Sequence, residues 1–167
     1  LTATFVINTY TLTVTTSGNG SVVKAPDQPS YNHFTPVTLT ATPVTGWSFT
    51  GWTGDTTTAT TPLSLVMTRN RSLTATFVIN TYTLAVTTSG SGSVVKAPDQ
   101  PTYTHGTPVT LTATPVTGWS FTGWTGDTTT ATTPLSLVMT RNRSLTATFV
   151  INTYTLTVTI SGSGSVA

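Results

Sequence analysis

Threonine alternates with apolar residues along most of this chain, with a period of two. Residues 10–15 read Tyr-Thr-Leu-Thr-Val-Thr, and residues 37–41 and 73–77 alternate in the same way. Successive side chains of a strand point to opposite faces, so this period is typical of strands with one buried face. The pattern predicts no helix of useful length, and it predicts strands near residues 10–16, 20–25, 37–43, 47–53, 62–68 and 73–79.

The whole pattern returns after 72 residues. The segment LTATFVINTYTL begins at Leu1, at Leu73 and at Leu145, so each step is 72 residues long. A fixed period of this kind indicates an array built from one fold unit. Residues 1–72 and 73–144 differ at five pairs of positions: Thr13/Ala85, Asn19/Ser91, Ser30/Thr102, Asn32/Thr104 and Phe34/Gly106.

The phase of the alternation indicates where one unit ends. Apolar residues occupy odd positions from Leu1 to Ile7 and even positions from Tyr10 to Val14. One flat strand cannot bury both sets, so we expect junctions at 8–9, 80–81 and 152–153. The expected domains are residues 10–79 and 82–151, with the last strand of a preceding repeat at 1–7 and the first strands of a truncated third repeat at 154–167. A two-residue junction predicts a stiff array.

The turn signals favour small antiparallel β-domains of about six strands each, with a sandwich-like arrangement. Segment 17–21, Ser-Gly-Asn-Gly-Ser, is typical of a hairpin turn. Pro-rich and Thr-rich loops near residues 25–29 and 56–62 separate the other strands.

Charge and cysteine are scarce. The chain has six Lys and Arg, four Asp and Glu, and no Cys among its 167 residues. Nucleic-acid binding needs clustered basic residues, which are absent. No apolar run reaches the roughly 18 residues of a membrane-spanning helix. A surface wetted by hydroxyl groups is typical of a secreted or cell-surface protein.

The aromatic segment and its neighbours resemble a known family. Residues 46–55 read Gly-Trp-Ser-Phe-Thr-Gly-Trp-Thr-Gly-Asp, residues 37–43 read Val-Thr-Leu-Thr-Ala-Thr-Pro, and residues 73–77 read Leu-Thr-Ala-Thr-Phe. They resemble the divergent internalin-B B-repeat of bacteria. The resemblance implies a tandem extracellular module without catalytic residues, and it makes a β-grasp-like topology the alternative fold. Phe34 departs from the family, which tends to have glycine there, as Gly106 does.

The aromatic residues are the main candidates for a site. Trp47 and Phe49, with their counterparts Trp119 and Phe121, are expected in the core. Trp52 and Trp124 fall on the other face of the strand unless Gly51 forms a bulge, and they are the candidate ligand-contact residues. His33 and His105 are expected to be solvated loop residues. The sequence predicts no catalytic, cofactor-binding or metal-binding residue.

These observations favour a structural role. We expect a stalk, spacer or fibre segment of a bacterial extracellular or cell-surface protein, and no enzyme. One alternative is an adhesin module that binds carbohydrate or a host through exposed aromatic residues. The other is a subunit of a self-assembling filament. The expected partners are neighbouring repeats of the same chain, then glycans or identical chains.

Overall fold

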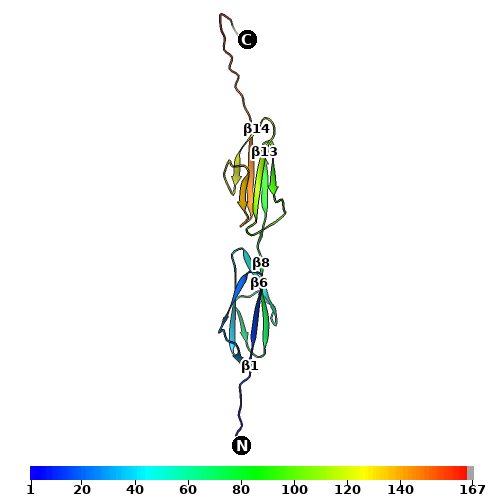
Figure 1. Cartoon of the computed structure of the whole chain (residues 1–167), viewed down its shortest axis with the longest axis vertical. Helices are drawn as coiled ribbons and strands as arrows, with labels where there is room; N and C mark the ends of the chain where they lie inside the picture. Colours follow the sequence, from blue (N-terminus) through cyan, green and yellow to red (C-terminus); the bar gives the residue numbers. More distant parts are fainter. Residues whose placement is uncertain (165–167) are drawn as a thin grey trace. The chain divides into compact units, whose positions relative to one another are not determined.

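A computed structural model describes residues 1–164, and within them the protein is all β (Figure 1). The alternation of threonine with apolar residues accounts for most of the longer strands, which bury one face and leave hydroxyl groups on the other. The strands of the first repeat are β1 (Thr9–Tyr10), β2 (Leu12–Ser17), β3 (Gly20–Ala25), β4 (Tyr31–Asn32), β5 (Pro36–Pro43), β6 (Trp47–Gly54), β7 (Leu63–Val66) and β8 (Arg71–Ile79).

The second repeat forms the same elements in the same order. Its strands are β9 (Thr81–Tyr82), β10 (Leu84–Ser89), β11 (Gly92–Ala97), β12 (Tyr103–Thr104), β13 (Pro108–Pro115), β14 (Trp119–Gly126), β15 (Leu135–Val138) and β16 (Arg143–Ile151).

Each repeat contains two three-stranded sheets and one short two-stranded sheet. In the first repeat the orders are β2-β8-β6, β3-β5-β7 and β1-β4, and the second repeat has the equivalent sheets. The buried side chains of both three-stranded sheets form one core cluster. This confirms the sandwich-like prediction. The β-grasp alternative needs a helix packed on a single sheet, and residues 1–164 contain no helix.

One strand pair in each repeat departs from the expected antiparallel pattern. Strands β2 and β8 are parallel and pair from Leu12↔Arg71 to Ser17↔Thr76, while β6 and β8, labelled in Figure 1, are antiparallel. The sequence pattern could not reveal this, because alternation fixes which face is buried but not the direction of the neighbouring strand. Strand β8 therefore lies at the centre of its sheet, between the first long strand of the repeat and β6.

The turn at 17–21 does not connect two strands that pair with each other, as a hairpin turn would. Strands β2 and β3, which it connects, belong to different sheets. The left-handed residue is Gly18, with φ of 82°, and a Cβ placed there would collide with the carbonyl oxygen of Phe77. The turn thus carries the chain from one sheet to the other across the end of the core, where only glycine fits.

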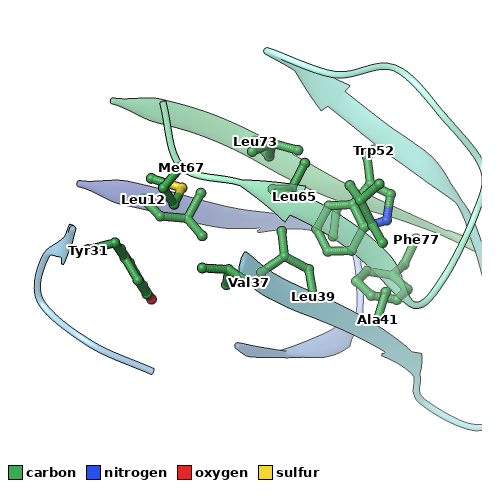
Figure 2. Close-up of a cluster of buried hydrophobic side chains, with 12 residues drawn as sticks. Leu12, Tyr31, Val37, Leu39, Ala41, Trp52, Leu65, Met67, Leu73 and Phe77 are labelled. Atoms are coloured by element: carbon green, nitrogen blue, oxygen red, sulfur yellow. The ribbon is translucent and has the colours of Figure 1, made fainter. Parts of the chain in front are cut away.

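The core runs between the two sheets along the length of the strands. Figure 2 shows Tyr31 and Met67 toward one end, and Trp52 and Phe77 toward the other. Tyr31 and Met67 are fully buried. The hydroxyl of Tyr31 donates to the carbonyl of Pro26 at 3.0 Å and accepts from the N–H of Gln28 at 3.2 Å. These bonds satisfy the one polar atom that this side chain takes into the core.

The two end segments contain no strand within the described residues. Residues 1–8 and 152–164 lie outside the strands, although they repeat the sequences of β8 and β2. In a whole repeat these two strands pair with each other, and β8 also pairs with β6. The end segments have no such neighbours in this chain, so alternation alone does not make them strands. The part of the expected third repeat at 165–167 lies outside the described residues.

Candidate functional site

The burial of the aromatic residues differs from the expectation. Trp52 and Trp124, the expected ligand-contact residues, are each 1% exposed and lie in the core. Trp47 and Phe49, expected in the core, are partly buried and pack at its border. Trp119 and Phe121 are likewise partly buried. The tryptophans at 52 and 124 therefore offer no ring face to a ligand.

A β-bulge at Gly51 explains why Trp52 lies in the core while Trp47 lies at its border. The register between β6 and β8 shifts between Phe49 and Gly51, so Thr50 has no partner residue on β8. Gly51 has φ of 150°, and a Cβ there would lie 3.0 Å from the carbonyl oxygen of Thr58. Because the bulge adds one residue, Phe49 and Trp52 face the same side of the sheet although they are three residues apart.

The indole of Trp52 is held on both sides. Its N–H donates to the carbonyl of Thr60 at 3.0 Å, and its ring meets that of Phe49 edge-on, with centroids 5.4 Å apart. The backbone of Trp52 also exchanges hydrogen bonds with Thr58. The Thr-rich loop after β6 is thus attached to the edge of this strand.

A shallow, uncharged hollow of about 300 Å3 lies where that loop meets β6. A hollow of similar size, about 290 Å3, occurs at the equivalent place in the second repeat. Most of its lining residues are threonines, and the bulge residue Gly51 is among them. Its lining in the first repeat is Thr50, Gly51, Trp52, Thr53, Thr57, Thr58, Ala59 and Thr76.

The carboxylates have structural partners. Asp55 accepts a hydrogen bond from the backbone N–H of Ser72 at 2.6 Å and forms an ion pair with Arg69 at 3.0 Å. Asp27 pairs with Lys24 at 2.8 Å, and its carboxylate raises the pKa of the Lys24 ammonium group. Within residues 1–164, no three His, Asp or Glu side chains gather as a metal site would require.

The loop after β4 contains Phe34, whose conformation and exposure the sequence did not predict. Phe34 has φ of 68°, the single left-handed non-glycine residue among those described, and 67% of it is exposed. Its ring lies on the imidazole of His33, with centroids 3.9 Å apart, and His33 also contacts Tyr10 at 5.7 Å. His33 is partly buried, in contrast to the solvated residue we expected. The sequence signal was the pairing of Phe34 with Gly106 in the other copy.

Comparison with known families identifies both repeats. The model described as the divergent InlB B-repeat domain matches residues 10–81 and 82–153. Tandem B-repeats are typical of bacterial surface proteins, and such repeat domains are typically not enzymes. No curated protein matches the chain. None of the described residues forms a helix that could cross a membrane.

Proposed function

Because this chain belongs to the divergent InlB B-repeat family, we propose that it is a load-bearing spacer in the stalk of a bacterial extracellular protein. Each repeat adds one folded length to the stalk and resists being pulled open. The match to a family that is typical of bacterial surface proteins supports an extracellular location. The proposed domains are residues 10–79 and 82–151, with junctions at 80–81 and 152–153.

The parallel pairing of β2 with β8 is the observation on which this proposal rests. These are the first and last long strands of the repeat, and six residue pairs join them. Parallel neighbours begin at the same end of a sheet and finish at the other. The chain therefore enters a repeat at one end of the β2–β8 pair and leaves it at the opposite end.

This arrangement decides how tension acts on a repeat. A pull on the two ends of the chain draws β2 and β8 in opposite directions along their shared axis. The hydrogen bonds of the ladder are then sheared together instead of being broken one at a time. Side chains reinforce the ladder, since the hydroxyls of Thr15 and Thr74 are hydrogen-bonded at 2.8 Å and the N–H of Thr11 donates to Asn70 Oδ1 at 2.9 Å.

The connection between repeats also supports a spacer. A single residue, Asn80, separates β8 from β9. Its N–H donates to the carbonyl of Gly46, and its carbonyl accepts from the N–H of His105, both at 2.8 Å. All three residues belong to the first compact unit, which comprises residues 1–82, 102–107 and 139–141. Both backbone groups of Asn80 are therefore hydrogen-bonded within the first compact unit.

Single-molecule stretching between the two termini tests the proposal. Each repeat should unfold in one step and release about 210–220 Å, which is about 70 residues at about 3.5 Å each, less a folded length of about 30 Å. The unfolding force should exceed that of a matched variant in which Thr15 and Thr87 are changed to glycine. These two residues are hydrogen-bonded through their hydroxyls to Thr74 and Thr146. Gradual extension without steps, or equal forces in both proteins, would contradict the shear mechanism.

A further inference from the structure

The turn between β2 and β3 contains the chain's only asparagine that precedes glycine. Asn19 is followed by Gly20, whereas threonine, histidine or arginine follows each of the other asparagines. The second repeat has Ser91 in place of Asn19 and forms the same two strands around it, β10 and β11. The turn itself therefore does not require an asparagine.

The turn lies at one end of the core. Gly18 and Gly20 both pack against Phe77, which Figure 2 places at the end opposite Tyr31. The loop after β4 follows Tyr31 and lies at that other end. Asn19 is exposed in a chain that contains the complete next repeat. The exposure of Asn19 is therefore independent of the residues that precede the first repeat.

The side chain of Asn19 is free to rotate. Within residues 1–164, its amide group has no hydrogen-bond partner. Other asparagines of the first repeat are held in place, since Asn70 Oδ1 accepts from the N–H of Thr11 and Asn80 Oδ1 accepts from the hydroxyl of Ser48. The carboxamide of Asn19 can thus turn toward the backbone that follows it.

The N–H of Gly20 points away from the neighbouring strand. The N–H of Val44 donates to the carbonyl of Asn19 at 3.3 Å, so these two residues occupy a hydrogen-bonded position between β3 and β5. The next pair of the antiparallel ladder, Gly20↔Pro43, is then a non-hydrogen-bonded one. Strand β3 is an edge strand, and no strand of its sheet lies on the side to which this N–H points. A glycine also has no Cβ to obstruct an approach to the preceding side chain.

We propose that Asn19 deamidates spontaneously in the folded protein, so that the first repeat gains a negative charge at a turn where the second repeat cannot. The backbone nitrogen of Gly20 attacks Cγ of Asn19 and gives up its proton, and a cyclic imide forms as the Cγ–Nδ2 bond breaks. The departing amide nitrogen takes up the proton and leaves as ammonia. Water then opens the imide at one of its two carbonyls, which gives either aspartate or isoaspartate.

The two products act differently on the fold. Aspartate lowers the formal net charge of +2 by one at an exposed position and leaves the backbone as it was. Isoaspartate also adds one atom to the main chain before Gly20. A Cβ on Gly20 would collide with the ring of Phe77, and one on Gly18 with the carbonyl oxygen of the same residue. Since the turn has no room to shift, isoaspartate should destabilise the first repeat.

The second repeat supplies matched controls. Asn19→Ser gives the first repeat the residue that the second repeat already accommodates. In the reverse direction, Gly92 follows Ser91, and the N–H of Val116 donates to the carbonyl of Ser91 at 3.3 Å, as the N–H of Val44 does to Asn19. Ser91→Asn should therefore create a second site of deamidation.

The experiment follows the full chain over several weeks in mildly alkaline buffer, folded in one sample and unfolded by urea in another. The tryptic peptide of residues 1–24 contains Asn19 and also Asn8, which precedes threonine and serves as the internal reference. Mass spectrometry of the folded sample should show the amide-to-acid shift at Asn19 and not at Asn8. Over the same period the wild type should release one ammonia per chain, Asn19→Ser none and Ser91→Asn two.

Thermal melting of the aged protein tests the effect on the fold. The melting temperature of the first repeat should fall in the fraction that contains isoaspartate, which fragmentation by electron transfer distinguishes from aspartate. Asn19→Asp should melt as the wild type does, because it has the charge without the added backbone atom.

Three results would overturn the proposal. The first is an intact Asn19 in the folded sample after the urea-unfolded chain has been converted, because the turn would then protect this residue. The second is conversion of Asn8 as fast as that of Asn19. The third is equal release of ammonia by the wild type and Asn19→Ser.

Discussion

Truncation of Trp52 tests the assignment of the core. Trp52 is 1% exposed, so Trp52→Ala removes a side chain of about 150–250 Å2 from the interior. At about 25 cal/mol per Å2, and with allowance for the methyl group that remains, the loss is about 3–5 kcal/mol. A domain of this size rarely has more than about 3–5 kcal/mol of stability. The first repeat of the variant should therefore be largely unfolded at 25 °C.

The chain supplies two controls for this measurement. Trp124→Ala should destabilise the second repeat to the same extent, because its indole is equally buried and donates to Thr132 at 3.0 Å. Trp47→Ala should cost less, about 2 kcal/mol, because Trp47 is only partly buried at the border of the core. Calorimetry of Trp52→Ala and of Trp124→Ala should show that the transition of one repeat is lost and that of the other stays at the wild-type temperature. Trp47→Ala should instead displace the transition of the first repeat to a lower temperature.

The ranking of the tryptophans is the decisive result. A Trp47→Ala variant less stable than Trp52→Ala would show that the bulge at Gly51 does not turn Trp52 inward. A loss below about 1 kcal/mol for Trp52→Ala would place its ring at the surface. Acrylamide quenching gives an independent check, because Trp47 should be quenched more readily than Trp52.

Three further predictions follow from the same geometry. Gly51→Ala should destabilise the first repeat by about 1–3 kcal/mol, because Gly51 has φ of 150° and the carbonyl of Thr58 lies nearby. Gly106→Ala should cost only about 1 kcal/mol, because a Cβ there meets no other atom. Urea unfolding measures both losses. Asp55→Ala should cost about 1 kcal/mol through the lost bond to Ser72 N–H, and Asp55→Asn, which keeps an acceptor, should cost less in the same assay. In small-angle scattering of arrays of four or more repeats, each added repeat should lengthen the maximum dimension by about 25–40 Å, and a much smaller increment would argue against a spacer.

The sequence predicted the long strands well, because the alternation of threonine with apolar residues indicates directly which face of a strand is buried. Leu73, Ala75 and Phe77 are buried at odd positions and Leu84 at an even one. The buried positions are thus odd-numbered in β8 and even-numbered in β10, as the alternation predicts.

The sequence was less informative about features that depend on single backbone angles or on partners distant in the chain. The sequence raised a bulge at Gly51 as a condition for turning Trp52 inward, but alternation alone cannot decide whether the bulge forms. The burial of Tyr31 depends on its bonds to residues 26 and 28, and the parallel pairing of β2 depends on a strand about 60 residues away. Phe34 was noticed as a difference between copies, but its exposure and positive φ required coordinates.

The direction of loading separates a shear-resistant repeat from one that is merely stable. Thr11 and Asn70 lie side by side at the end of the β2–β8 pair where both strands begin, since the N–H of Thr11 donates to Asn70 Oδ1 and the N–H of Arg71 donates to the carbonyl of Thr11. Handles attached at Thr11→Cys and Asn70→Cys would pull these strand ends directly apart.

In that geometry the ladder opens one pair at a time from Leu12↔Arg71 onward, and each bond bears the whole load in turn. In the terminal geometry the six pairs bear it together. The cysteine variant lacks the bond from Thr11 N–H to Asn70 Oδ1, so the same variant is pulled in both geometries. It should yield at a lower force between residues 11 and 70 than between its termini. Equal forces in the two geometries would mean that the β2–β8 ladder does not set the mechanical strength, and the proposed load-bearing role would lose its basis.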